Sequence, residues 1–153
     1  MSELIRGLAV PLFDRLSQDD AVSGARYLET EQAIRDSIAR ELHRLFNTRS
    51  SLHLQNYADG NGSVLEYGIP DFSSVSIQNN TEMDVLRRAL TLAVERFEPR
   101  LGKVSVKFDG RSASTFNSVS VNIASEARIG TELRRMDFEI ALDSSADRSV
   151  KIT

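Results

Sequence analysis

The stretch Ala93-Val94-Glu95-Arg96-Phe97-Glu98-Pro99-Arg100-Leu101 marks the point where a helical pattern stops and a strand pattern begins. Because the residue before a proline is pushed out of the α region, the helix is expected to end at or near Glu98. A carboxylate at a helix C-terminus meets the negative end of the macrodipole, at a cost of roughly 0.3–1 kcal/mol. Glu98 therefore needs a cation, and Arg96 and Arg100 are close in the chain. Two interpretations are open: a surface ion pair worth ~0–1 kcal/mol, or a bidentate Arg–carboxylate pair that faces a partner.

Two helices are predicted before this corner. The first spans about Thr30 to Asn47, with Thr30 as its N-cap, and the second spans about Asn80 to Phe97. Thr81, with Asp84 three residues later, resembles a capping box at the start of the second helix. Each helix carries one apolar stripe: Ile34, Ile38, Leu42, Leu45 and Phe46 in the first, and Leu86, Leu90, Ala93, Val94 and Phe97 in the second.

After Gly102 the apolar period changes from 3.6 to 2, which indicates strands. The alternating sets are Val104, Val106 and Phe108; Val119, Val121 and Ile123; Met136, Phe138, Ile140 and Leu142; and Val150 with Ile152. Each strand has one apolar and one polar face, as in an antiparallel sheet that packs on one side. The sequence thus predicts an α+β fold, with two long amphipathic helices packed on one face of a small antiparallel sheet of three to four strands.

The chain is divided into three parts by these patterns. Residues 1–28 are an N-terminal arm with a short helical turn at Pro11–Leu16, residues 29–146 form a single α+β domain, and residues 147–153 are a C-terminal tail or edge strand. The connection over residues 50–79 reads as mostly irregular and is long for a compact domain. Such connections are often functional.

The composition is that of an ordinary globular protein. The chain has 153 residues, 41% hydrophobic and 27% charged, a net charge of −3 and no cysteine. No apolar run approaches the length of a membrane span, and the start Met-Ser-Glu-Leu-Ile-Arg-Gly lacks the apolar core of a signal peptide. We therefore expect a cytoplasmic protein without direct membrane insertion or a nucleic-acid partner. The two histidines, His43 and His53, are far apart and predict no metal site or cofactor.

Candidate catalytic chemistry is weak. Glu95 and Glu98 lie three apart on one helix, and two carboxyls at a suitable distance can serve glycoside hydrolysis. That reaction needs a cleft and one acid kept protonated, and the sequence indicates neither. The basic doublets Arg87-Arg88 and Arg134-Arg135 more simply solvate polar faces than follow phosphates. The chain is expected not to be an enzyme.

Four blocks of sequence resemble the TssE family of type VI secretion baseplate wedge proteins. Leu12-Phe13-Asp14-Arg15-Leu16 is similar to the family's opening Leu-Leu-Asp-Arg-Leu, and Leu42–Arg49 to its helix end Asp-Leu-x-x-Leu-Leu-Asn-Thr-Arg, with Glu41 at the place of the Asp. Tyr67–Phe72 resembles Tyr-Gly-Leu-Pro-Asp-Phe, and Phe97–Leu101 contains the family's Glu-Pro-Arg signature. The blocks occur in the family's order.

The resemblance implies a structural subunit of a cytoplasmic baseplate that contains TssF, TssG and TssK. TssE is similar to the small wedge protein of contractile phage baseplates, a family once labelled lysozyme-like. The resemblance implies that Glu98, Pro99 and Arg100 grip a helical bundle of TssF and TssG. It also implies an open strand edge, like that of the handshake domain of the sheath subunits TssB and TssC, on which the sheath polymerises. The candidates for that edge are Met136, Phe138, Ile140, Leu142, Val150 and Ile152.

Three alternatives stay open beside this interpretation. The first is a wedge protein of another contractile injection system or of a phage tail. The second is a muralytic, lysozyme-like enzyme. The third is a regulatory adaptor of the same fold that binds a single response regulator.

Overall fold

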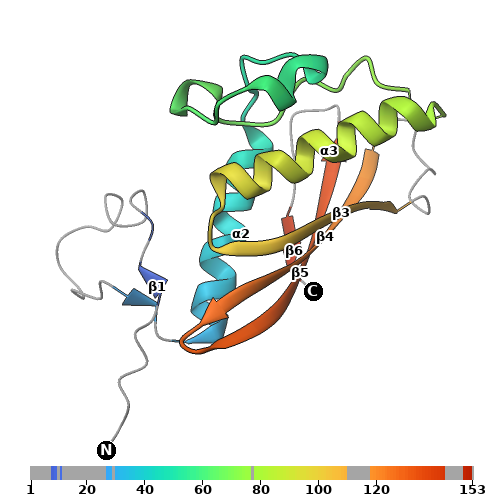
Figure 1. Cartoon of the computed structure of the whole chain (residues 1–153). Coiled ribbons are helices and arrows are strands. Elements are labelled where there is room, and N and C mark those ends of the chain that lie inside the picture. Colours follow the sequence, from blue (N-terminus) through green and yellow to red (C-terminus); the bar gives the residue numbers. More distant parts are fainter. Residues whose placement is uncertain are drawn as a thin grey trace, which may run out of the picture.

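The computed structural model describes residues 8–9, 11, 27–28, 30–76, 78–109, 118–143 and 150–152. Figure 1 shows helices lying against a twisted sheet, with a looped layer above α3. The elements in chain order are β1 (Leu8–Ala9), β2 (Tyr27–Leu28), α2 (Glu31–Asn47), the 3₁₀ turns η1 (Leu54–Asp59) and η2 (Val64–Glu66), α3 (Asn80–Phe97), β3 (Leu101–Asp109), β4 (Ser118–Ile129), β5 (Glu132–Asp143) and β6 (Val150–Ile152). Within the described part, no helix is both long and apolar enough to span a bilayer.

Both helices form where the sequence predicts them, although one cap differs. Thr30 caps α2, because its side-chain oxygen accepts from the N–H of Ala33 at 3.1 Å. At the start of α3 the cap is Asn79, whose side chain accepts from the N–H groups of Thr81 and Glu82. The predicted capping box at Thr81 is therefore wrong by two residues. The asparagine side chain reaches the first free amides before the threonine can.

The sheet is antiparallel, in the order β3-β4-β5-β6. Its register keeps the apolar residues of neighbouring strands in line, with Val106 opposite Ile123 and Ile123 opposite Phe138. β4 and β5 join at a tight turn in which Gly130 adopts a positive φ of 61°. Because side chains alternate along each strand, this register gathers the apolar side chains on one face.

The core joins that face to the helices. Its buried residues from α2 and α3 are Ile34, Ile38, Ala39, Leu42, Leu45, Phe46, Leu86, Ala89, Leu90, Ala93 and Val94, and its strand residues include Val106, Val121, Ile123, Met136, Phe138, Ile140 and Leu142. α3 runs along β3, whereas α2 contacts β6 and meets α3. The α+β class and the antiparallel sheet are confirmed. That both long helices pack on one face of the sheet stays a prediction.

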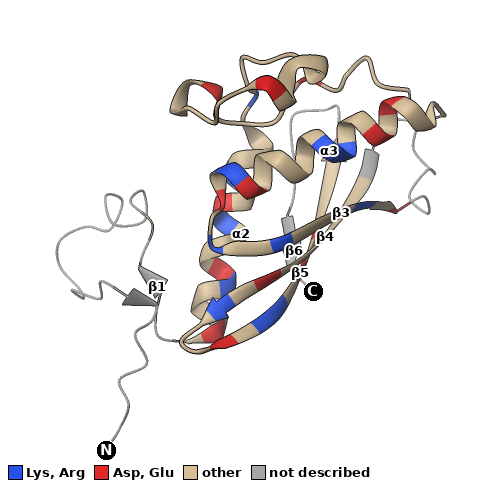
Figure 2. Ribbon diagram, viewed as in Figure 1, with Lys and Arg blue, Asp and Glu red and all other residues tan. Residues whose placement is uncertain are grey.

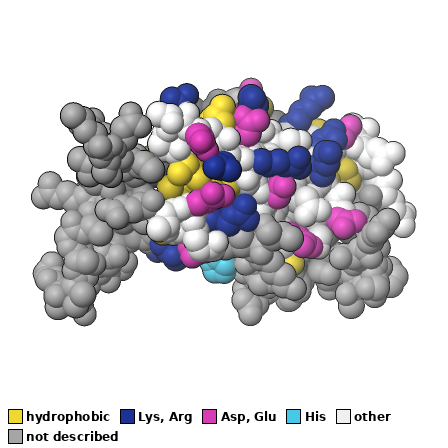
Figure 3. All heavy atoms as spheres, turned by 90° about the horizontal axis from the view of Figure 1, so that it is seen from below, with side chains coloured by type: hydrophobic (Ala, Val, Ile, Leu, Met, Phe, Trp, Pro, Cys, Tyr) yellow, Lys and Arg dark blue, Asp and Glu magenta, His cyan; other side chains and the backbone are white. Residues whose placement is uncertain are grey.

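One face of the molecule is rich in charged side chains (Figure 3). Viewed from below, it shows basic and acidic side chains interspersed, with little hydrophobic surface between them (Figure 3). One such pair joins Lys103 on β3 to Glu126 on β4 at 2.9 Å. Mixed charges of this kind suit a surface in contact with water.

Several sequence predictions fall outside the described residues. They include the helical turn at Pro11–Leu16, of which only Pro11 is described, and residues 147–149 of the C-terminal tail. β1 and β2 pair with each other as a short antiparallel ladder. The division into an arm, a domain and a tail stays a prediction. The connection over residues 50–79 is more ordered than expected, since η1 and η2 lie within it.

Candidate functional site

The corner between α3 and β3 is built by Glu98, Pro99 and Arg100. Glu98 leaves the helical region at φ −126° and ψ 72°, while its N–H still donates to the carbonyl of Val94 at 2.8 Å. The chain then turns so tightly that the N–H of Leu101 donates to the Glu98 carbonyl at 3.1 Å. The predicted end of the helix at Glu98 is confirmed. Pro99 sits exposed at the tip of the turn.

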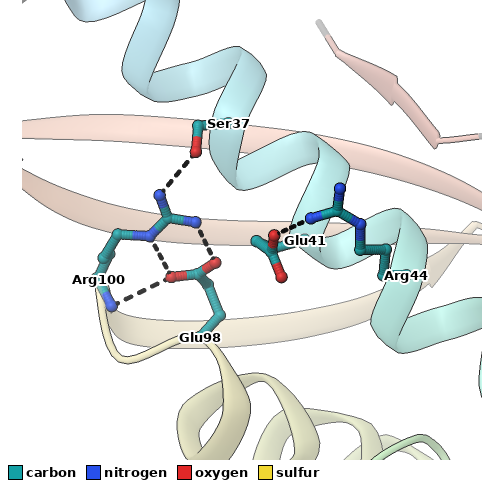
Figure 4. Close-up of polar contacts among 5 residues, drawn as sticks. All are labelled: Ser37, Glu41, Arg44, Glu98 and Arg100. Atoms are coloured by element: carbon teal, nitrogen blue, oxygen red, sulfur yellow. Dashed lines mark hydrogen bonds and ion pairs between the residues drawn. The ribbon is translucent and has the colours of Figure 1, made fainter. Parts of the chain in front are cut away.

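The Glu98 carboxylate and the Arg100 guanidinium form a bidentate ion pair (Figure 4). Nε of Arg100 donates to Oε1 at 2.6 Å and Nη2 donates to Oε2 at 2.5 Å. The side chain of Glu98 is 3% exposed and that of Arg100 is 14% exposed. The bidentate geometry was one of the two predicted forms. Within the chain the carboxylate is buried beneath the guanidinium, and that the pair faces a partner stays a prediction.

The pair is also anchored to α2, 63 residues earlier in the chain. Nη1 of Arg100 donates to the Oγ of Ser37 at 2.9 Å, and Ser37 is fully buried. In Figure 4 the Glu41–Arg44 ion pair lies one turn further along the same helix. Sequence reasoning missed Ser37. The only signal for Ser37 in the sequence is that a polar residue occupies a core-facing position of the apolar stripe that starts at Ile34.

Arg96, the other cation considered for Glu98, has a different role. Its two terminal nitrogens donate to the carbonyls of Tyr57 and Ala58, both at 3.0 Å. Its guanidinium also lies over the Tyr57 ring, 5.8 Å from the centroid. Arg96 therefore ties α3 to η1, and Arg100 alone of these two neutralises Glu98.

The turn at Tyr67–Phe72 packs against the end of α2. The N–H of Ile69 donates to the Thr48 carbonyl and the N–H of Ser50 donates to the Ile69 carbonyl, both at 2.9 Å. Arg49 follows with an ion pair to Asp71 at 2.9 Å and a position 4.9 Å above the Phe72 ring. In the sequence Arg49 was noted only as the end of the block Leu42–Arg49. The structure shows that it holds this turn.

Tyr67 joins the turn to the corner. Its ring meets that of Phe97 edge to face, with centroids 5.2 Å apart. Burial raises the pKa of the Tyr67 hydroxyl, and the nearby carboxylates of Glu41 and Glu98 raise it further against the opposing effect of Arg44. Three of the four sequence blocks, at 42–49, 67–72 and 97–101, are thus connected in space.

The strand residues proposed as a sheath-binding edge divide into two groups. On β5, the side chains of Met136, Phe138, Ile140 and Leu142 are all buried in the core. β5 lies between β4 and β6, and β6 pairs with it at Phe138–Ile140. The expectation that β5 supplies the edge there is wrong, because β6 occupies that position. Among the described strands, β6, which contains Val150 and Ile152, is the last on this side of the sheet.

The two carboxyls considered for catalysis lie in different surroundings. Glu98 is held by Arg100, while Glu95 is exposed on α3. Among the described residues, no group of three His, Asp or Glu side chains has the geometry of a metal site. His43 lies near Asn47 on the exposed side of α2.

The fold and the corner thus define a small α+β domain in which one buried ion pair, Glu98–Arg100, holds the corner between α3 and β3. The chain belongs to the family described as "Baseplate wedge protein gp25", whose profile matches residues 32–147. That match includes both helices, the corner and the three long strands. No curated protein sequence matches the chain.

A solved structure has a similar fold. A chain of "The baseplate complex from the type VI secretion system" superposes with a TM-score of 0.52 at 19% sequence identity. The alignment covers 74% of the present chain and 98% of that chain. At this identity the likeness concerns the fold.

Proposed function

We propose that the chain is a non-enzymatic subunit of a cytoplasmic type VI secretion baseplate, where it links the wedge to the contractile sheath. Its expected partners are TssF, TssG and TssK in the baseplate and TssB and TssC in the sheath. The single observation that carries this proposal is the family match over residues 32–147. The fold likeness to a type VI baseplate chain favours this system over other contractile machines.

The geometry of the corner limits how it can bind the wedge. Glu98 and Arg100 satisfy each other inside the chain, so they present little charge to a partner. Pro99 is exposed at the tip. We infer that the pair fixes the shape of the turn and that Pro99 and the surrounding surface contact the helical bundle of TssF and TssG.

The sheath contact is assigned to the β6 side of the sheet. A strand at the end of a sheet has one unpaired row of backbone N–H and C=O groups, which can add a further strand by main-chain hydrogen bonds. β6 is such a strand. The buried side chains of β5 take no direct part in this contact and instead support the sheet from the core.

Affinity purification of the tagged protein from its native cells tests the wedge contact. We expect chains similar to TssF and TssG to co-purify with the native protein. Pro99→Asp places a charge on the exposed tip and should reduce their recovery, whereas Glu95→Lys, a charge change on the exposed side of α3, should not. Wedge subunits of a phage tail among the recovered chains would support a phage tail as the assembly. Recovery of a lone response regulator would contradict the baseplate proposal.

Removal of residues 150–153 tests the sheath contact. The truncated protein should still recover the wedge chains, while sheath assembly, followed by fluorescent sheath subunits in cells, should be lost. Normal sheath growth on a folded truncated protein would contradict the proposed role of β6. A turbidity assay on cell walls should show no lysis by the purified protein, and lysis that disappears in Glu98→Gln would favour the muralytic alternative.

A further inference from the structure

A groove runs between α3 and β3, at the opposite edge of the sheet from β6. It has a volume of about 560 Å³ and is lined by Arg87, Arg88, Thr91 and Leu92 of α3 and by the stretch 104–107 of β3. We propose that this α3–β3 groove binds an extended acidic segment of a partner protein, which adds to β3 as a further strand.

The lining shows that the groove follows a strand edge. Successive side chains of a strand point to opposite faces, so a hollow lined by Val104, Ser105, Val106 and Lys107 must touch both faces of β3. That is possible only along its edge. β3 pairs with β4 alone among the described strands. Its other row of backbone groups therefore faces the groove.

The usable part of this edge is the run Ser105–Asp109. β3 and β4 keep an unbroken register there, whereas the register shifts between Gly102 and Ser105, where Lys103 has a positive φ of 51°. At about 3.4 Å per residue, the regular run offers an incoming strand roughly 15 Å of backbone. This irregularity ends the regular edge of β3 on the side nearest the Glu98–Arg100 corner.

The basic side chains around the α3–β3 groove favour an acidic binding partner. Arg87 and Arg88 lie on the helical side of the groove and Lys107 on the strand side, and Figure 2 shows the basic positions on α3 and on β3 beneath it. Neither Arg88 nor Lys107 makes an ion pair with any described residue. Arg87 pairs with Asp84 at 2.5 Å, but both side chains are about half exposed. Three cations around an apolar floor formed by Leu92, Val104 and Val106 favour a strand that alternates carboxylates with apolar residues.

The same charges argue against a second copy of this chain. Lysine on an edge strand and a bulge beside it are common ways to prevent two edges from pairing. An approaching β3 of another copy would bring Lys107 and Arg88 against their own counterparts. The basic rim therefore repels an identical edge and attracts an acidic one. The inference does not depend on the proposed sheath contact, which lies at the opposite side of the sheet.

Binding of labelled peptides to the full-length protein tests the proposal. The probe is a ten-residue fluorescein peptide in which Glu alternates with Val, compared with a peptide in which Gln replaces Glu and with the acidic peptide N-methylated at alternate residues. Fluorescence anisotropy at low salt should show binding of the acidic peptide alone, and the affinity should fall as salt is added. Hydrogen exchange should slow at Ser105–Asp109 when the peptide binds.

Charge reversal locates the site. Arg88→Glu and Lys107→Glu should each weaken the acidic peptide on the order of fivefold to tenfold. Arg128→Glu, an equal change at an exposed position on β4 outside the groove, should leave affinity unchanged. A melting curve for each variant verifies that it is folded.

Several outcomes would overturn the proposal. They are no binding of the acidic peptide at millimolar concentration, equal binding of the Gln or N-methylated peptide, and equal loss of affinity in Arg128→Glu. Slowed exchange at β6 in place of β3 would also overturn it. Failure here leaves the baseplate function untouched, because the wedge and sheath experiments use other surfaces.

Discussion

Replacement of Arg100 by alanine is the most direct test of how the corner is held. It removes two hydrogen bonds to Glu98 and one to Ser37, and it leaves a carboxylate that is only 3% exposed without a counterion. Removing one partner of a buried ion pair typically costs about 3–5 kcal/mol, because the remaining charge keeps its desolvation penalty. Arg100 is itself 14% exposed, so water enters once it is gone, and we expect the lower end, about 3 kcal/mol. At about 2–4 °C per kcal/mol for a chain of this size, Tm should fall by roughly 6–12 °C.

Urea unfolding at pH 7, followed by circular dichroism, measures this loss. The matched control is Arg134→Ala, which removes an ion pair to Glu132 whose side chains are 54% and 66% exposed. That pair is worth at most about 1 kcal/mol. The double variant Glu98→Gln with Arg100→Ala should be more stable than Arg100→Ala alone, because the uncompensated charge is gone. If Arg100→Ala and the control unfold at the same urea concentration, the corner is not held by this ion pair.

Three further predictions test the connection over residues 50–79 and the start of α3. Gly68→Ala should lower the free energy of unfolding by about 2 kcal/mol or more, measured by urea titration, because Gly68 has a φ of 119° and a Cβ there would lie 2.6 Å from the Thr48 carbonyl. Burial is the main cause that raises the pKa of Tyr57 to about 12. The stabilisation that the neutral Tyr57 hydroxyl gives the folded protein is therefore complete below pH 10 and is lost as pH rises toward 12. Tyr57→Phe should lower the free energy of unfolding by about 1 kcal/mol at pH 7, because it removes the hydrogen bond from the hydroxyl to the Gly68 carbonyl at 2.6 Å. Between pH 10 and 12, however, this variant should lose less stability than the native protein in the same titration. Asn79→Ala should cost about 1 kcal/mol through loss of the α3 cap, and an unchanged melting curve would show that Thr81 replaces it.

The helices and the corner were predictable because their signals are local. A proline fixes the end of α3 at Glu98, and the stripe of apolar residues in each helix identifies the buried face. The period of two after Gly102 likewise identified the three long strands. Each of these inferences depends on residues within a few positions of one another, and the structure agrees with all of them.

The parts that sequence reasoning missed depend on contacts between distant residues. Ser37 reaches Arg100 across 63 positions, and Arg96 reaches Tyr57 across 39. A helical pattern cannot say which of two nearby cations turns toward Glu98 and which turns away to another layer. The choice between β5 and β6 as the edge strand was left open for the same reason. Alternation shows that Phe138 and Ile140 lie in a strand, but strand order depends on where β6 returns.

The burial of the Glu98–Arg100 pair changes how variants at this corner should be interpreted. The pair connects the end of α3, the start of β3 and the middle of α2, so its loss weakens three elements at once. A variant at Glu98 or Arg100 that fails to assemble can fail because the corner no longer holds its shape, without loss of any contact to a partner. Pro99 is exposed and takes no part in the pair, and its substitution separates the two causes. Loss of wedge binding in a Pro99 variant of native stability points to contact at the tip, whereas loss confined to Glu98 and Arg100 variants of lowered stability points to the architecture of the corner.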